Sequence, residues 1–173
     1  MLEIIAKRRS CRKFDRNHPV EKEKIAEIVK AGLYAPSGQG HQDGIVVVIS
    51  KPEIRDRLAV INAKIGGWPE DFDPFYGAPV VLLVACKKNP YPDLDGAAMI
   101  QNMLLEATAH GLATCWIHRA KPEWEMPKVR ELLSSSGLNF DDYVGVDHIA
   151  LGYGLSGEPA PKTIKDGRVF YID

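Results

Sequence analysis

Two apolar segments constrain the fold of this chain more than any other feature of its sequence. Residues 45–49 (IVVVI) and 79–86 (PVVLLVAC) lack the alternation of apolar and polar side chains that marks a strand with one face in water. Each segment is therefore predicted to be a strand covered on both faces. Helices on both sides of a sheet make a three-layer domain of the α/β or α+β class.

Segments with helical periodicity separate the predicted strands. Apolar residues at i, i+3 and i+4 predict an amphipathic helix over 21–33, which Pro36 ends. A less regular pattern predicts a helix over 54–65. The other expected elements are a short helical stripe at 2–6, helices over 95–110 and 124–134, and strands at 114–117, 143–153 and 168–172. The central sheet is expected to be mixed.

The predicted helix over 95–110 is apolar around most of its circumference, which is typical of a helix buried on more than one side. In a chain of 173 residues, a second copy of the chain is the expected cover. The segment at 168–172 follows a long irregular stretch. It is a candidate strand for pairing with the partner's sheet edge.

Length and composition favour a single globular unit over residues 1–173. The formal net charge of -1 gives no support to general binding of nucleic acid or of membrane surfaces. No apolar run approaches the ~20 residues that span a bilayer, and the first residues do not resemble a signal peptide. Three cysteines without a close pair indicate reduced thiols, so a cytoplasmic location is expected.

Five cations and a hydroxyl are concentrated in residues 7–13 (KRRSCRK), which we call the basic segment. Arginine donates paired, charge-assisted hydrogen bonds to phosphate, and Ser10 can add another donor. The basic segment therefore predicts a local anion site. The alternative interpretation is a solvated end of the first helix.

Other motifs carry little chemistry. Residues 152–157 spell G-x-G-x-x-G, but the prolines at 159 and 161 cannot open the helix that this motif requires, so a turn is expected. The histidines are dispersed, and no metal site is predicted. No serine nucleophile motif occurs, and Cys11 is only a minor candidate nucleophile beside arginines. No catalytic side chain is assigned.

The remaining candidates are cationic or small residues from distant parts of the chain. They are the basic segment, the small loop at 36–38, and Lys162, Lys165 and Arg168 near the end. Small residues allow the backbone to approach a flat ligand closely. If the cations converge on one phosphate, the combination fits a phosphorylated, planar cofactor better than a nucleic acid.

In their order along the chain, these segments resemble the nitroreductase family of FMN-dependent oxidoreductases. The resemblance covers nearly the whole sequence. It rests on residues 8–14 (RRSCRKF), 35–38 (APSG), 101–104 (QNML), 111–117 (GLATCWI), 151–153 (LGY) and 161–168. It implies an α+β, three-layer α/β/α nitroreductase-like fold. It also implies an intertwined homodimer with FMN at the subunit interface.

The resemblance implies a role for each group of residues. The basic segment would hold the phosphate and ribityl chain, and the small loop would reach the flavin ring from the partner subunit. Residues 115–118 would lie along the ring with main-chain amides near its N5 and O4 edge, and the tail would close the phosphate pocket. The cofactor-binding residues implied are Arg8, Arg9, Ser10, Arg12, Pro36, Ser37, Gly38, Gln42, Cys115, Trp116, Ile117, His118, Lys165 and Arg168.

Two positions depart from the family pattern. The family often has asparagine where this chain has Gly40, and arginine where it has Ile164. One polar contact to the cofactor or substrate is therefore absent at position 40. Phosphate binding is then expected to depend mainly on Arg8 and Arg12.

By the same resemblance, NADH or NADPH would pass hydride to the flavin, leave, and be replaced by a small-molecule acceptor in ping-pong order, with no protein acid or base required.

A loop at 66–77 is a candidate lid for flat acceptors such as nitroaromatics or quinones. Its aromatic residues either form the lid or merely fasten the loop to the core. They are Trp68, Phe72, Phe75 and Tyr76.

Two other functions remain open from the sequence. One is a specialised enzyme on the same scaffold, such as a reductive dehalogenase or a flavin-cleaving enzyme. The other is a non-enzymatic module that binds anions or nucleic acid through the basic segment.

Overall fold

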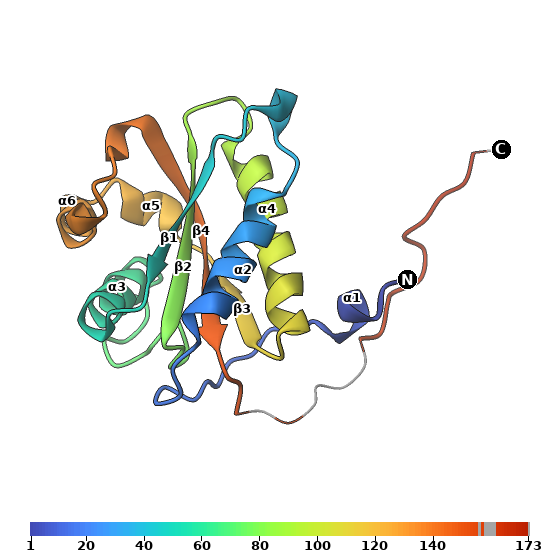
Figure 1. Cartoon of the computed structure of the whole chain (residues 1–173), viewed down its shortest axis with the longest axis horizontal. Helices are drawn as coiled ribbons and strands as arrows, with labels where there is room; N and C mark the ends of the chain where they lie inside the picture. Colours follow the sequence, from blue (N-terminus) through green and yellow to red (C-terminus); the bar gives the residue numbers. More distant parts are fainter. Residues whose placement is uncertain (156, 158–161, 173) are drawn as a thin grey trace.

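The computed structural model describes residues 1–155, 157 and 162–172. Its centre is a sheet of β1 (Gly44–Ile49), β2 (Val80–Lys87), β3 (Ala113–Ile117) and β4 (Tyr143–Gly152), in the order β1-β2-β4-β3 (Figure 1). These strands pair antiparallel throughout, rather than in the expected mixed sheet. The parallel component in the described residues is a single bridge between Ser10 and Thr114, because the segment around Ser10 only touches the sheet edge.

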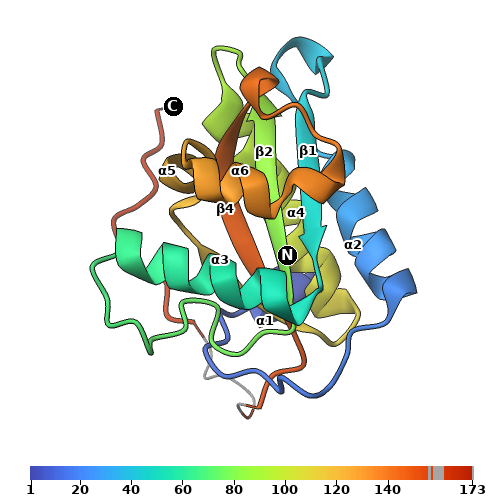
Figure 2. The same ribbon diagram turned by 90° about the vertical axis from the view of Figure 1, so that its left-hand side faces the viewer.

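Helices cover both faces of the sheet, which confirms the three-layer α+β arrangement. The helices α2 (Lys22–Leu33) and α4 (Pro92–Ala109) lie on one face. The helices α3 (Pro52–Ile65), α5 (Ala120–Trp124) and α6 (Pro127–Leu132) lie on the other (Figure 2).

The strand β2 shows why its sequence lacks alternation. Val80, Leu82 and Val84 pack toward α4, whereas Val81 and Leu83 pack toward α3, and all are buried. The prediction of a doubly covered strand is therefore confirmed for β2. The edge strand β1 is only half-buried over most of its length.

Prolines explain two differences from the predicted helices. The helix α4 begins at Pro92, three residues before the predicted start, because proline is well tolerated in a first helical turn. The predicted helix over 124–134 is shorter in the structure: α5 already ends at Trp124, and α6 covers Pro127–Leu132. Met126 is extended and Pro127 opens α6, so the first helix cannot continue through this point.

A glycine sets how closely α4 approaches the sheet. A Cβ at Gly96 would lie 2.7 Å from either Cγ of Val146 on β4. A larger residue here would push α4 away from the sheet. This close approach sets the distance between the first part of α4 and β4.

The chain that follows β4 pairs with residues near the amino end of the protein. After Gly152 the chain pairs with the end of the basic segment and the residues that follow it. Tyr153 O accepts from Asp15 N at 2.8 Å, and Leu155 N donates to Lys13 O at 2.9 Å. Of the turn expected at 152–157, Ser156 lies outside the described residues, as do residues 158–161 after it.

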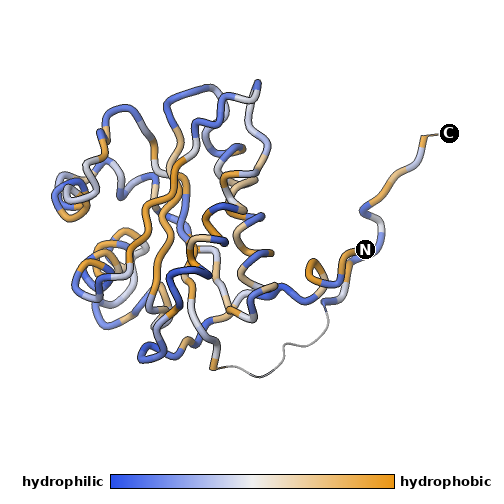
Figure 3. The backbone as a smooth tube through the Cα atoms, in the orientation of Figure 1, coloured by the Kyte–Doolittle hydropathy of each residue, from blue (hydrophilic) through white to orange (hydrophobic). Residues whose placement is uncertain are grey.

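Both terminal segments leave apolar side chains in solvent. The short helix α1 (Glu3–Lys7) buries none of its residues, and residues 162–172 lead away from the body of the protein (Figure 1). Figure 3 shows apolar stretches in both terminal segments, at a distance from the apolar strands in the centre of the protein. The strand predicted at 168–172 is not formed, since this segment has no strand to pair with in the described chain.

No helix among the residues placed by the structure has both the length and the apolar character that crossing a membrane requires.

Candidate functional site

The basic segment lies along the outer edge of β3. Ser10 forms its bridge with Thr114, and Cys11 N donates to Thr114 O at 2.8 Å. Phe14 then enters the core, and its N–H donates to Tyr76 O at 3.2 Å. Three groups predicted from distant parts of the sequence therefore meet here: the basic segment, β3 and the loop at 66–77.

Beyond this bridge, β3 offers an open main-chain edge. Thr114 O points outward to Cys11 N, and β4 occupies the opposite edge of the strand. Because successive residues of a strand alternate their N–H and C=O direction, Trp116 N–H lies on the same outer edge as Thr114. A flat ligand beside β3 would meet this donor.

The side chains of β3 contribute unequally to such a site. Cys115 and Ile117 face the core and are buried, so neither side chain can contact a ligand beside β3. Burial raises the pKa of the Cys115 thiol above its usual value, while the positive charges of Arg12 and Arg8 lower it less. The thiol is therefore protonated at neutral pH.

The cations of the basic segment have different surroundings. The Arg9 guanidinium folds back on the end of α1, donating to Ala6 O at 2.5 Å and Arg8 O at 2.9 Å. The charges of Arg8 and Arg12 and the side-chain hydrogen bond with Ser10 each lower the pKa of the Cys115 thiol, so these three side chains lie beside β3. Within the part of the chain that the structure describes, neither Arg8 nor Arg12 forms an ion pair with a carboxylate. They are available for an anion.

An aspartate links two polar side chains at the end of β3. Asp147 Oδ2, on β4, accepts from Trp116 Nε1 at 2.7 Å and lies 2.8 Å from His118 Nδ1. The side chain of Asp147 is 14% exposed, whereas that of His118 is 75% exposed. An anchored carboxylate therefore holds an imidazole that projects into solvent.

The small loop lies elsewhere in the protomer. Gly38 N donates to Asp95 Oδ1 at 2.9 Å in the first turn of α4, and Ser37 Oγ accepts from Gln42 N at 2.9 Å. A Cβ at Gly38 would lie 3.0 Å from the Tyr91 ring, so packing inside the protomer already requires a small residue there. Gln39 and Gln42 both have φ of 54°, in the left-handed region.

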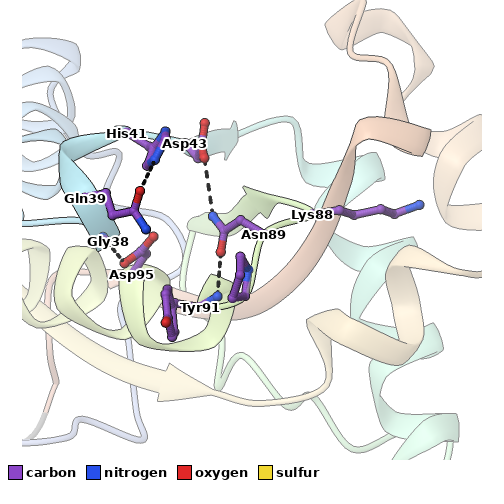
Figure 4. Close-up of a pocket in the computed structure, with 9 residues that line it drawn as sticks. Gly38, Gln39, His41, Asp43, Lys88, Asn89, Tyr91 and Asp95 are labelled. Atoms are coloured by element: carbon purple, nitrogen blue, oxygen red, sulfur yellow. Dashed lines mark hydrogen bonds between the residues drawn. The ribbon is translucent and has the colours of Figure 1, made fainter.

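A cavity of about 300 Å³ lies beside this loop (Figure 4). Figure 4 shows Gln39 and His41 on one side of it and Asn89 and Tyr91 on the other, with Asp43 beside His41. The Asn89 side chain donates to Asp43 and accepts from Tyr91 N. The cavity walls are thus held by bonds within the protomer.

One protomer does not bring the small loop to the basic segment. The loop precedes β1 and touches the start of α4, whereas Ser10 lies at β3, the other edge of the sheet. Two intervening strands separate these edges by about 14 Å. The 18 residues of α4 add a length of about 27 Å between its two ends. Pro36, Ser37, Gly38 and Gln42 therefore cannot share a small ligand with Ser10 in one protomer.

The tail cations are also separate. Lys165 and Arg168 are exposed, in the segment that leaves the body of the protein. No bond among the residues in 1–155 and 162–172 joins either side chain to the basic segment.

The loop at 66–77 divides into an anchored half and an exposed half. Trp68 and Phe72 meet edge to face with ring centroids 4.8 Å apart, and Tyr76 lies 6.1 Å from Phe72. Phe75, in contrast, is fully buried against the ring of His148. The expectation that Phe75 belongs to the lid surface is therefore wrong, because its side chain fills the core.

Asp73 anchors the second half of this loop. Its carboxylate accepts from Phe75 N at 2.9 Å and Gly77 N at 2.8 Å, and it pairs with the buried Arg55. Arg55 also donates to Ala78 O at 3.0 Å. These bonds hold the second half of the loop against the core.

Sequence reasoning missed two carboxylates of this region. Asp95 is the first residue of the helix predicted over 95–110, and nothing in the sequence indicates that it holds Gly38 in place. Asp147 has a signal in the sequence, because it is a charged residue inside an otherwise apolar strand. Its partners depend on pairing between β3 and β4. Within the described residues, no three His, Cys, Asp or Glu side chains are grouped to hold a metal ion.

Comparison with known proteins gives a consistent result. The model of the nitroreductase family matches residues 5–66 and 67–153. A protein of Archaeoglobus fulgidus, provisionally named an NADH dehydrogenase/NAD(P)H nitroreductase, is 28% identical over 169 residues, which cover 95% of this chain and 87% of that protein.

Solved structures agree in fold. A nitroreductase with bound FMN from Bacteroides fragilis is 29% identical, with a TM-score of 0.86, over 99% of this chain and 97% of that one. An FMN-dependent nitroreductase from Clostridium difficile, at 19% identity, has a TM-score of 0.82 over 98% and 97% of the two chains. At 19% identity, the likeness to the Clostridium difficile protein concerns the fold alone.

Proposed function

Because this chain belongs to the nitroreductase family, we propose that it is an FMN-dependent NAD(P)H oxidoreductase that reduces flat acceptors such as nitroaromatics and quinones. The observation that carries the proposal is the position of the basic segment along β3. The FMN seen in the Bacteroides fragilis relative supports the choice of cofactor. The names of the relatives support a nicotinamide donor.

The residues of this chain fit FMN. Arg8, Ser10 and Arg12 would hold the terminal phosphate, because they combine two guanidinium groups without carboxylate partners and a hydroxyl beside an open strand edge. Trp116 N–H would donate to the polar edge of the ring. When bound, FMN would supply the redox chemistry, which is hydride transfer between the nicotinamide and the acceptor. The protein binds, orients and shields it.

We further propose that the site is completed by a second copy of the chain. Pro36, Ser37, Gly38 and Gln42 cannot reach the basic segment of their own protomer, so a partner would have to supply them. Exposed apolar residues that a partner would cover support this arrangement: Leu33, Tyr34, Phe170, Tyr171 and Ile172. The tail would then carry Lys165 and Arg168 to the phosphate, and residues 168–172 would pair with the partner's sheet edge.

The experiment that tests the function uses the purified full chain. We expect it to bind FMN, to oxidise NADH or NADPH, and to give parallel double-reciprocal plots when donor and quinone are varied, because both use one pocket in turn. Sedimentation should show a dimer. A protein that shows no absorbance change with FMN, and whose binding to DNA falls steeply with salt, would instead support a non-enzymatic anion-binding module.

A further inference from the structure

We propose that His118, oriented by Asp147, donates the proton that the acceptor needs during its reduction. This inference rests on the proposed function and adds a catalytic side chain that the sequence alone did not require. Its basis is the pair formed by His118 Nδ1 and Asp147 Oδ2 at 2.8 Å, with the histidine side chain 75% exposed.

The geometry directs the reactive nitrogen of His118 outward. A carboxylate can only accept, so the bond to Asp147 requires the proton on Nδ1. The other nitrogen, Nε2, is then the one available to a ligand. Asp147 is itself held by Trp116 Nε1 at 2.7 Å, so the carboxylate is fixed before the imidazole is. An imidazole oriented by a carboxylate is a common arrangement for proton transfer.

The position of His118 suits an acceptor stacked on a flavin. It follows β3 directly, four residues beyond the Thr114 that bridges Ser10. At about 3.3 Å per residue, this is about 13 Å along the strand from the proposed phosphate site. An extended FMN places its ring system at a comparable distance from its phosphate. His118 Nε2 would thus lie near the ring rather than near the phosphate.

The cationic side chains that follow His118 in the sequence already have partners of their own. Arg119, the next residue, donates from Nε to Asn62 Oδ1 at 2.9 Å and lies over the Trp68 ring at 4.2 Å. Lys121 on α5 pairs with Asp93 on α4 at 3.0 Å. From β4, Asp147 is the charged group that contacts the imidazole. Asp147 is therefore the carboxylate that orients the imidazole of His118.

The proposed step balances in atoms and charge. Reduction of a quinone to a hydroquinone takes one hydride, which originates from NADH or NADPH and arrives through the flavin, and one proton. In this step His118 starts as the imidazolium, with protons on both ring nitrogens, and gives its Nε2 proton to the acceptor oxygen that becomes negatively charged. The neutral imidazole keeps its Nδ1–H bond to Asp147 and regains a proton on Nε2 from water.

Rapid kinetics of the FMN-loaded dimer test the proposal. In His118→Gln, flavin reduction by NADH should stay within about twofold of wild type, while reoxidation by a quinone should slow by roughly 10²-fold, the usual contribution of a general acid. Asp147→Asn should slow reoxidation by about tenfold, because the imidazole loses its orienting partner. Added imidazole should partly restore reoxidation in His118→Gly. His18→Gln, which changes a histidine that stacks on Tyr153 and does not contact Asp147, is the matched control.

A second measurement does not depend on turnover. The His118 Cε1–H resonance, identified by its loss in His118→Gln, should shift when FMN is added to the wild-type protein. If FMN binds and this resonance does not move, or if reoxidation is unchanged in His118→Gln, the inference is overturned and the proposed function stands. If FMN does not bind at all, the proposed function fails, and this inference fails with it.

Discussion

The main-chain amide of Gly38 donates a 2.9 Å hydrogen bond to Oδ1 of Asp95, a residue with only 7% of its surface exposed. Asp95→Ala leaves this amide without its acceptor. We expect a loss of about 1–3 kcal/mol in the free energy of unfolding, measured with urea. Asp93→Ala, which removes an exposed acid from the same helical turn, should change it by less than about 1 kcal/mol. Equal effects of the two changes would contradict a structural role for this bond.

The proposed phosphate site makes a direct prediction about FMN affinity. Arg8→Ala and Arg12→Ala should each weaken binding by about 1.5–3 kcal/mol, or roughly 10- to 100-fold in Kd, because each removes a charged donor to phosphate. Titration of flavin fluorescence measures this. Arg16→Ala is the matched control, because Arg16 is paired with Asp56 at 2.5 Å on the surface. Unchanged affinity in both Arg8→Ala and Arg12→Ala would refute the assignment.

Features set by local sequence were predicted well. The doubly buried β2 and the amphipathic α2 follow from side-chain periodicity, which depends only on neighbouring residues. The basic segment was likewise evident from charge alone.

Features set by pairing between distant segments were not predictable. The approach of Asp147 to His118 depends on the register of β3 with β4, and the separation of Ser37 from Ser10 depends on the order of strands in the sheet. Phe75 and Phe72 have similar sequence surroundings. Asp73 and Arg55 determine that Phe75, and not Phe72, faces the core.

Glu21 predicts how stability changes in acid. Hydrogen bonds from its own main chain, from Lys24 and from Tyr153 lower the pKa of this carboxyl from 4.5 to about 2. A carboxyl with a lowered folded-state pKa stabilises the protein above its unfolded pKa. This stabilisation is lost as the pH falls from about 4.5 to about 2.

Glu21→Gln should therefore lower Tm at pH 7 and have less effect near pH 2, where the wild-type group is becoming protonated. Thermal unfolding across this range measures the difference. The same decrease in Tm at both pH values would indicate that charge on Glu21 does not matter.

The cysteines should differ in their reactivity. Burial raises the pKa of Cys86 to about 12, and it also raises that of Cys115, so both remain protonated thiols near pH 8. Cys11 is partly exposed. A thiol reagent at pH 8 should therefore label one cysteine quickly and three after denaturation, with the fast site lost in Cys11→Ser. Rapid labelling of Cys86 in the folded protein would contradict its burial.

The two phenylalanines of the loop at 66–77 should respond in opposite ways. Phe75→Ala removes a fully buried ring that packs on His148, so we expect a loss of about 3–5 kcal/mol in the free energy of unfolding.

Phe72→Ala removes a ring from the exposed half of the loop, where it contacts Trp68 and Tyr76. It should cost less than about 1.5 kcal/mol, the typical worth of an aromatic pair. Its effect should instead appear in kcat/KM, with a larger decrease for flat aromatic acceptors than for a small non-aromatic one. If Phe72→Ala leaves this ratio of acceptors unchanged, the aromatic residues only fasten the loop to the core, and no lid is needed.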